Sequence, residues 1–405
     1  MEFYQIVLLV LSAVLKLAAL YTLVVVLFAF RKPRGYADCA PKTKFAVLIA
    51  ARNEEAVIGN LVKSLLEQDY PRELFDVFVA PNNCSDNTAE AALKAGARII
   101  ECRIPVSNKG EVLHDTLSQL MNGEYDYDAF CIFDADNVAD KSFLKEMNKA
   151  FCAGANVAKG ASEVGNRNES WVAGSYGVYF DLFNVFYNRP RMNAKLSAKL
   201  IGTAFAVSKN YLEKTGGWRT QTIAEDAEFA ADCAANGERV WYVPEAVSYD
   251  EAPNSFAVSL KQRKRWCSGV LQVGKIKLPR LAKTFVKSGN LLALDLFVFI
   301  ATPVNQFMSL VINGFSLIVS ELTLWEIGLL CLSSCFAAYV VMSLFALLLE
   351  TLILRRGVKS VKGALAFPIF TLSFVALLVY CVLHKTTRWD DIKHTGSVGL
   401  EYSQR

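Results

Sequence analysis

Apolar and polar residues are unevenly distributed along the chain, with apolar blocks at both ends and a mixed stretch between them. Residues 4–30 are nearly all apolar and exceed the roughly 20 residues that a bilayer-spanning helix needs. Further apolar blocks occur at 291–320, 324–354 and 363–383. The mixed stretch, from residue 31 to about 288, is long enough to bury one large core. We therefore predict a globular domain held between membrane segments.

Within the mixed stretch, continuous apolar runs alternate with apolar residues at helical spacing. The runs are typical of buried parallel strands and lie at 45–50, 76–80, 97–100 and 129–133. The stretches with helical spacing lie at 57–66, 88–95 and 111–121. This alternation predicts a mostly parallel sheet with helices on both faces. Because ligands bind such sheets beyond the carboxyl ends of the strands, residues 82–86 and 134–136 are candidates for a site.

Basic residues beside the apolar blocks predict the orientation of the chain in a membrane. Arg31, Lys32 and Arg34 follow the first block, which is typical of a retained anchor and places the next domain in the cytoplasm. The cluster between the last two blocks predicts a second cytoplasmic segment and comprises Arg355, Arg356, Lys359 and Lys362.

The side of the membrane that holds the C-terminus stays open. Simple counting of spans places it outside, whereas Lys385 and Arg388 favour the inside. An interfacial or re-entrant segment would reconcile the two, and the stretch with Asp295 and Pro303 is the first candidate.

Composition narrows the range of functions that the chain could have. A net charge of +4 without a basic arm gives no sign of nucleic-acid binding. The ten cysteines form no CxxC pair, and with three histidines no zinc-site spacing occurs. We expect free thiols in a reducing compartment.

Two acidic pairs are candidates for chemistry. Asp134 and Asp136 follow a predicted buried strand and are suited to share Mg²⁺ or Mn²⁺, which prefer oxygen ligands; the alternative is a solvated acidic loop. Glu225 and Asp226 precede a helical pattern. A carboxylate there would serve as a general base for a sugar hydroxyl, or it would only cap the helix dipole.

Basic and aromatic residues form a further cluster on an amphipathic helix predicted at about 255–273. Arg263 and Arg265 are suited to grip a diphosphate, and Trp266 to stack on a sugar ring, unless this face lies on the membrane surface. Lys109 would reach a phosphate or lie on the surface. Gly202, beside Thr203, permits close approach of the backbone.

Taken in chain order, these motifs resemble the family 2 glycosyltransferases of the cellulose, chitin and hyaluronan synthase type, over about residues 44–275. The motifs are Arg52-Asn53-Glu54-Glu55, Asn83-Cys84-Ser85-Asp86, Lys109-Gly110, Asp134-Ala135-Asp136, Gly202-Thr203, Gly217-Trp218, Glu225-Asp226 and Gln262-Arg263-Lys264-Arg265-Trp266. The last, QxxRW, is the most specific. The family often has Asp where this chain has Asn82, and threonine where it has Ala224.

The resemblance implies a GT-A-type α/β fold, with transmembrane helices at both ends, and an inverting mechanism. Asp134 and Asp136 would hold Mg²⁺ or Mn²⁺, and Asp226, with Glu225 beside it, would activate the acceptor. The nucleotide-sugar donor would contact Asn53, Glu55, Asn82, Asp86, Lys109, Asp134, Arg263 and Arg265. The acceptor would contact Gly202, Thr203, Gln262 and Trp266.

We expect a multi-pass plasma-membrane enzyme that polymerises a UDP-sugar, foremost UDP-glucose and next UDP-GlcNAc, into a β-linked polysaccharide and extrudes it. The alternative is transfer of one sugar to a polyprenyl phosphate or another lipid. A transporter or channel subunit with a nucleotide-sensing domain is disfavoured by the few charges in the apolar blocks. Expected partners are the UDP-sugar, the growing glycan, the bilayer, and a second copy or accessory export proteins.

The expected organisation has five parts. They are a membrane anchor (1–30), a GT-A domain (31–254), interfacial helices with QxxRW (255–288), a membrane region of about three helices (289–384) and a tail (385–405).

Overall fold

The computed structural model describes residues 3–32, 35–123, 126–320, 322–356, 361–384 and 396–403. Its centre is a mixed sheet with the strand order β3-β2-β1-β4-β7-β6-β8-β5. The strands are β1 Phe45–Ala51, β2 Phe75–Pro81, β3 Arg98–Ile99, β4 Ala129–Asp134, β5 Asn137–Ala139, β6 Val157–Val164, β7 Phe205–Ser208 and β8 Val240–Asp250. The parallel pairs are β1–β2, β1–β4, β2–β3 and β6–β8, whereas β7 runs antiparallel to β4 and β6.

Helices cover both faces of this sheet, as the sequence predicted. The helices of the sheet-containing domain, which the resemblance predicts to be the catalytic domain, are α2 Ile58–Leu66, α3 Thr88–Ala95, α4 Lys109–Met121, α5 Phe143–Cys152, α6 Trp171–Leu182, α7 Arg189–Asn193, α8 Lys209–Thr215 and α9 Glu225–Ala235. They are followed by α10 Phe256–Ser288, and a π-helical segment at Phe183–Asn188 continues α6. The predicted α/β fold class is therefore confirmed.

Two hydrophobic cores result from the alternation of side chains along the strands. On β1, Phe45, Val47 and Ile49 face one side and pack with α2 and α5. Ala46 and Leu48 face the other side, in a core that α4 and α9 share with α10 and α11. The second core thus extends from the sheet to the membrane-facing helices, which explains why the catalytic domain sits directly on them.

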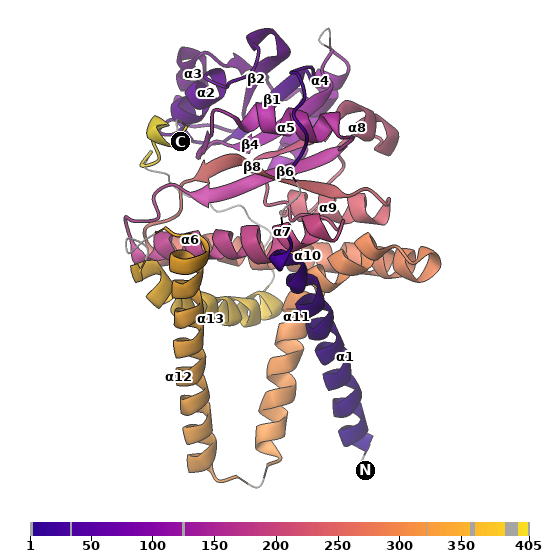
Figure 1. Ribbon diagram of the computed structural model, residues 1–405, viewed down its shortest axis with the longest axis vertical. Helices are drawn as coiled ribbons and strands as arrows, with labels where there is room; N and C mark the ends of the chain where they lie inside the picture. The colour runs from indigo at the N-terminus through magenta and orange to yellow at the C-terminus, as the bar shows by residue number, and fades with distance from the viewer. Residues whose placement is uncertain are drawn as a thin grey trace.

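Four described helices are long and apolar enough to cross a membrane. They are α1 Phe3–Val26, continued by a 3₁₀ turn to Phe30, α11 Leu291–Ile318, α12 Leu324–Leu348, continued by a π-helical segment to Ile353, and α13 Val361–Leu383. Figure 1 shows α1, α11 and α12 running away from the sheet, whereas α13 lies crosswise beneath α6 and α10.

The crosswise helix is therefore α13, whereas the Asp295–Pro303 stretch, expected to be interfacial or re-entrant, lies in the projecting helix α11. How either helix sits in a membrane stays a prediction. Asp295 lies in α11, one of the three projecting helices, and its carboxylate accepts hydrogen bonds from Arg191 at 2.8 and 2.9 Å. Tyr21 of α1 donates to the same carboxylate at 3.1 Å. The charge thus ties α11 and α1 to the catalytic domain.

Close helix contact holds α13 in place. A Cβ atom on Gly363 would lie 2.4 Å from the backbone of Gly174, so α13 and α6 touch at two glycines. A larger residue would force these helices apart.

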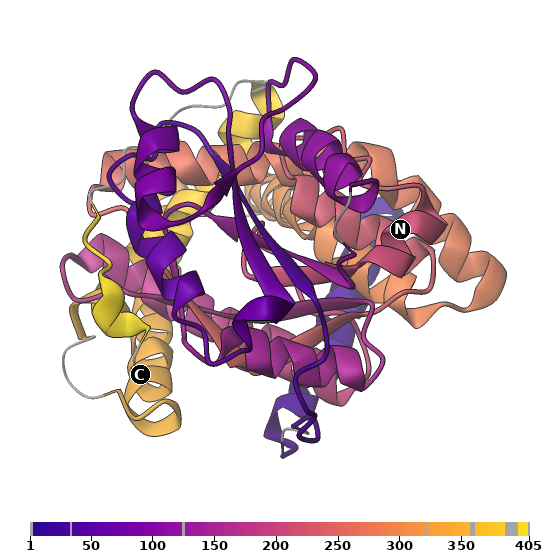
Figure 2. The ribbon, with the colours of Figure 1, turned by 90° about the horizontal axis from the view of Figure 1, so that it is seen from above.

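The chain returns to the catalytic domain after α13. The backbone amides of Gly396 and Ser397 donate to Glu251 at 2.9 and 3.1 Å. Asn60 of α2 donates to the carbonyl of Val398 at 3.2 Å. Figures 1 and 2 both show this C-terminal segment, in yellow, beside the catalytic domain. Several residues beside the apolar blocks lie outside the described part of the chain, namely Pro33 and the basic residues Arg34, Lys359, Lys385 and Arg388.

The expectation that all cysteines are free is wrong for one pair. Cys39 and Cys152 form a disulfide, and the other eight are free. The pairing follows from the path of the segment before β1. Asn148 of α5 donates to the carbonyls of Cys39 and Ala40 and so holds this segment against α5.

Candidate active site

One cavity of about 1280 Å³ runs from the carboxyl ends of β1, β2 and β4 down to the membrane-facing helices. Its upper half is polar and its lower half is apolar. Most of the residues that the sequence predicted line it, namely Asn53, Glu55, Asn82, Asp86, Lys109, Asp134, Asp136, Gly202, Thr203, Glu225, Asp226, Gln262, Arg265 and Trp266. Arg263 does not.

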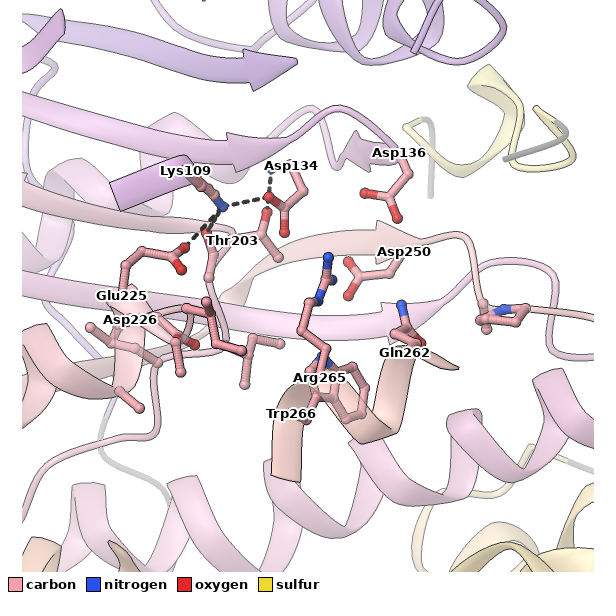
Figure 3. Close-up of a pocket in the computed structure, with 18 of the residues that line it drawn as sticks. Lys109, Asp134, Asp136, Thr203, Glu225, Asp226, Asp250, Gln262, Arg265 and Trp266 are labelled. Carbon is pink, nitrogen blue, oxygen red and sulfur yellow. Dashed lines mark hydrogen bonds and ion pairs between the residues drawn. The ribbon is translucent and has the colours of Figure 1, made fainter. Parts of the chain in front are cut away.

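Lys109 is the buried cation of the polar half. Its ammonium contacts Asp134, donates to the carbonyl of Gly202 at 2.6 Å, and lies 3.6 Å from the Glu225 carboxylate (Figure 3). Although burial opposes its charge, Asp134 and Glu225 raise the pKa of Lys109 above its ordinary value. Lys109 therefore joins the end of β4 to the start of α9.

A hydrogen-bonded chain positions the first acidic pair. The amide of Asp134 donates to Thr203 at 2.9 Å, and the Thr203 hydroxyl donates to Asn137. Asn137 in turn donates to Asp250 at 2.9 Å. The acidic residues at the ends of β4 and β8 are thus held together across one side of the cavity (Figure 3).

The carboxylates of the polar half repel one another. Burial, and then Asp136 and Asp134, raises the pKa of Glu54 to about 9. Burial and Asp136 likewise raise the pKa of Asp250 well above its ordinary value. Such a concentration of carboxylate oxygens fits a hard divalent cation, for which one or two carboxylates suffice when phosphates supply further ligands.

Glu225 and Asp226 begin α9 but face different surroundings. Glu225 points to Lys109, and burial raises its pKa to about 7 even though Lys109 opposes the shift. Burial also raises the pKa of Asp226. A Cβ atom on Gly269 of α10 would lie 2.7 Å from the side chain of Ala224, so α10 packs closely against the start of α9. This contact brings the acidic pair and the QxxRW motif to the same cavity.

Three residues of QxxRW face the cavity, and one does not. Figure 3 shows Gln262, Arg265 and Trp266 on one side of α10, with Arg265 extending toward Asp250. Arg263 points to α13, where it donates to the carbonyl of Phe370 and the hydroxyl of Ser373, both at 2.7 Å. Its predicted role in donor binding is corrected, because its buried guanidinium lies in a helix–helix contact.

The lower half of the cavity is formed by α6, α10, α11 and α13. Most of its lining is aromatic or aliphatic and includes Tyr176, Tyr179, Phe180, Phe183, Ile201, Trp266, Val270, Phe299, Pro303, Phe374 and Leu378. Its polar members are Lys199, Thr302, Gln306 and Thr371. Because these helices include the membrane-facing ones, an apolar molecule from a bilayer would meet the polar half here.

Sequence reasoning missed several lining residues. Glu54 lies inside a quoted motif but had no predicted role, and Asp250 is the last residue of β8, a strand that was not predicted. Lys199 stands three positions before Gly202 and also lines the cavity. An acidic residue at the end of a strand would have been a usable signal for Asp250, whereas nothing in the sequence singles out Lys199.

Comparison with known proteins identifies relatives. The family model described as "Glycosyltransferase like family 2" matches residues 41–269. "Probable glycosyltransferase YdaM" of Bacillus subtilis is 27% identical over 284 residues, which cover 68% of this chain and 66% of that protein. "Beta-monoglucosyldiacylglycerol synthase" of Synechocystis is 25% identical over 249 residues, which cover 59% and 50%. The matches thus span half to two thirds of these relatives.

The fold has a solved counterpart. Mannosyltransferase PcManGT from Pyrobaculum calidifontis, in complex with GDP-Man and Mn²⁺, superposes with a TM-score of 0.61 at 16% identity, over 89% of this chain and 97% of that one. At this identity the similarity shows a shared fold.

Proposed function

The chain belongs to glycosyltransferase family 2, whose members use nucleotide sugars, and from this premise we propose that it transfers one hexose from a UDP-sugar to a membrane lipid. UDP-glucose is the first candidate donor. The observation that supports the lipid acceptor is the cavity itself, in which a polar half at the strand ends opens into an apolar half between membrane-facing helices.

The polar half would hold the donor. Asp134 and Asp136 would bind Mg²⁺ or Mn²⁺, which when present offsets the negative charge of the departing diphosphate. Arg265, on α10, would contact the diphosphate through its fork of N–H donors. Asn53, Glu55, Asn82 and Asp86, at the ends of β1 and β2, are placed for the nucleoside.

The acceptor would meet the donor beside α9. Asp226 would take the proton of the acceptor hydroxyl while its oxygen bonds to the anomeric carbon, opposite the departing UDP. Attack from that side inverts the anomeric centre, so an α-linked donor gives a β-linked product. Glu225 would hold Lys109 near the diphosphate.

A lipid acceptor is favoured over the expected polysaccharide, because a growing glycan carries many hydroxyls that an apolar wall leaves unpaired. The relative named "Beta-monoglucosyldiacylglycerol synthase" supports the same choice. Polymer synthesis is the second candidate. It is favoured by Gln262 and Trp266, which line the cavity with a polar group and an indole suited to stack on a sugar ring.

Product analysis tests the proposal. The purified protein would be given UDP-glucose, UDP-GlcNAc and other UDP-sugars with Mn²⁺ and a bacterial lipid extract. The expected product is an organic-soluble lipid carrying one hexose, identified by mass spectrometry. A water-soluble or insoluble ladder would support the polymer instead, and release of UDP without any glycosylated product would contradict both.

A further inference from the structure

Lys199 is a cation within the acceptor half of the cavity that the proposed chemistry leaves unused. It lies between α7 and β7, on the loop that also carries Gly202 and Thr203. Its backbone amide donates to Asn188 at 2.9 Å, which fixes the loop where the side chain begins. The side chain lines the same cavity as Asp226.

Aromatic rings surround this ammonium. Its nitrogen lies 3.7 Å from the ring centroid of Phe183, 5.2 Å from that of Phe299 and 5.8 Å from that of Tyr179. These rings belong to α6, to its π-helical continuation and to α11. The ring faces attract the cation but accept no ordinary hydrogen bond from it.

Among the residues that the structure describes, no carboxylate lies at ion-pair distance from Lys199. Within the described parts of the chain, its ammonium makes no hydrogen bond and no ion pair. Burial lowers the pKa of Lys199 to about 8, and Asp226 opposes this shift. Lys199 is half-buried and lines the cavity, so its three donors are left to the aromatic rings and to whatever ligand enters, and a ligand with negative charge would lower the cost of keeping the cation there.

We propose that Lys199 binds a phosphate group on the acceptor, so that the enzyme selects phosphate-bearing lipids over neutral ones. The inference rests on the proposed lipid acceptor and narrows its class. A phosphate supplies both the negative charge and the acceptor oxygens that the aromatic rings lack, whereas a neutral hydroxyl supplies no charge. In the polar half, Lys109 and Arg265 line the cavity where the donor diphosphate would bind, so the diphosphate does not need Lys199.

Two kinds of lipid carry such a group. In a phosphoglycerolipid such as phosphatidylglycerol, a headgroup hydroxyl would attack the sugar and give its proton to Asp226. In a lipid monophosphate, a phosphate oxygen would attack and no proton would need to leave. In both, the bond between the anomeric carbon and the UDP oxygen breaks with its electron pair, and UDP departs.

The test compares Lys199→Met and Lys199→Arg with the wild type on three acceptors in mixed micelles, namely phosphatidylglycerol, polyprenyl monophosphate and diacylglycerol. Lys199→Met should raise KM for the phosphate-bearing acceptor by about 10-fold or more, because a charged hydrogen bond is lost. Lys199→Arg should restore most of the affinity. UDP binding by each variant shows that the protein is folded.

Lys195→Met is the matched control, because Lys195 lies on the same loop but is exposed. It should leave the acceptor preference unchanged.

Retention of activity by Asp226→Asn on the monophosphate, but not on phosphatidylglycerol, would identify the phosphate oxygen as the attacking group. Preference of the wild type for diacylglycerol, or an equal effect of Lys199→Met on all acceptors, would overturn the inference and leave the proposed function intact. No transfer to any lipid would contradict the proposed function.

Discussion

At the scale of single residues, the neighbours Glu225 and Asp226 have two different proposed roles. Glu225 lies 3.6 Å from Lys109, whereas the Asp226 carboxylate accepts a hydrogen bond from the backbone of Ala227. For an acceptor hydroxyl, Asp226→Asn should lower kcat by about 100-fold or more, because the proton has no acceptor. Binding of UDP, followed by calorimetry, should stay the same. Wild-type turnover in this variant would contradict the assignment.

Glu54 predicts how stability depends on pH. Burial raises the pKa of Glu54 from its ordinary value of 4.5 to about 9 in the folded protein. The stability linked to this proton is therefore complete below about pH 4.5 and is lost as the pH rises toward 9, by about 1.4 kcal/mol per pH unit. With EDTA present, the melting temperature of the wild type should fall between pH 5.5 and 8.5, and that of Glu54→Gln should fall less. Parallel curves would show that Glu54 is not the titrating group.

At the scale of secondary-structure elements, α10 carries two arginines with different functions. Arg263 stabilises the contact with α13, so Arg263→Met should lower the free energy of unfolding by about 2 kcal/mol. The UDP affinity of the folded fraction should not change. Arg265→Met should instead weaken UDP binding by about 10-fold and leave the melting temperature nearly unchanged. The reverse pattern would restore the diphosphate role to Arg263.

The same helix shows what sequence could and could not predict. The first four strands, the helices between them and the position of Asp134 at the end of β4 follow from local periodicity, and the structure has them, whereas β5 to β8 were not predicted. The direction of Arg263 could not be predicted, because α10 packs against apolar surfaces on more than one side and periodicity does not rank them. The aromatic rings around Lys199 could not be predicted either, because Phe183 and Phe299 come from separate parts of the chain.

At the scale of the whole molecule, α1, α11 and α12 project from the catalytic domain, and α13 lies crosswise beneath α6 and α10. Segment 396–403 contacts the catalytic domain, and α1, α11 and α12 are long and apolar enough to cross a membrane. We therefore predict that the domain and this segment lie on the same side of the membrane. Counting apolar blocks could not reveal this, because length and hydropathy do not tell a crosswise helix from a spanning one. A single cysteine at Glu401 and one at Lys94, both exposed positions, each in a background without other exposed cysteines, should be labelled from the same side in oriented vesicles. Labelling from opposite sides would refute this topology.

The central claim is that donor and lipid meet in one continuous cavity. Thr302 lines its apolar half on α11, whereas Leu310 lies on the same helix, is 43% exposed and does not line the cavity. Thr302→Trp fills the acceptor path, and Leu310→Trp is the matched control. The account predicts that Thr302→Trp lowers transfer to lipid by about 10- to 100-fold with unchanged UDP affinity, because overpacking excludes the acceptor. Normal transfer to lipid by a folded Thr302→Trp protein would contradict the account.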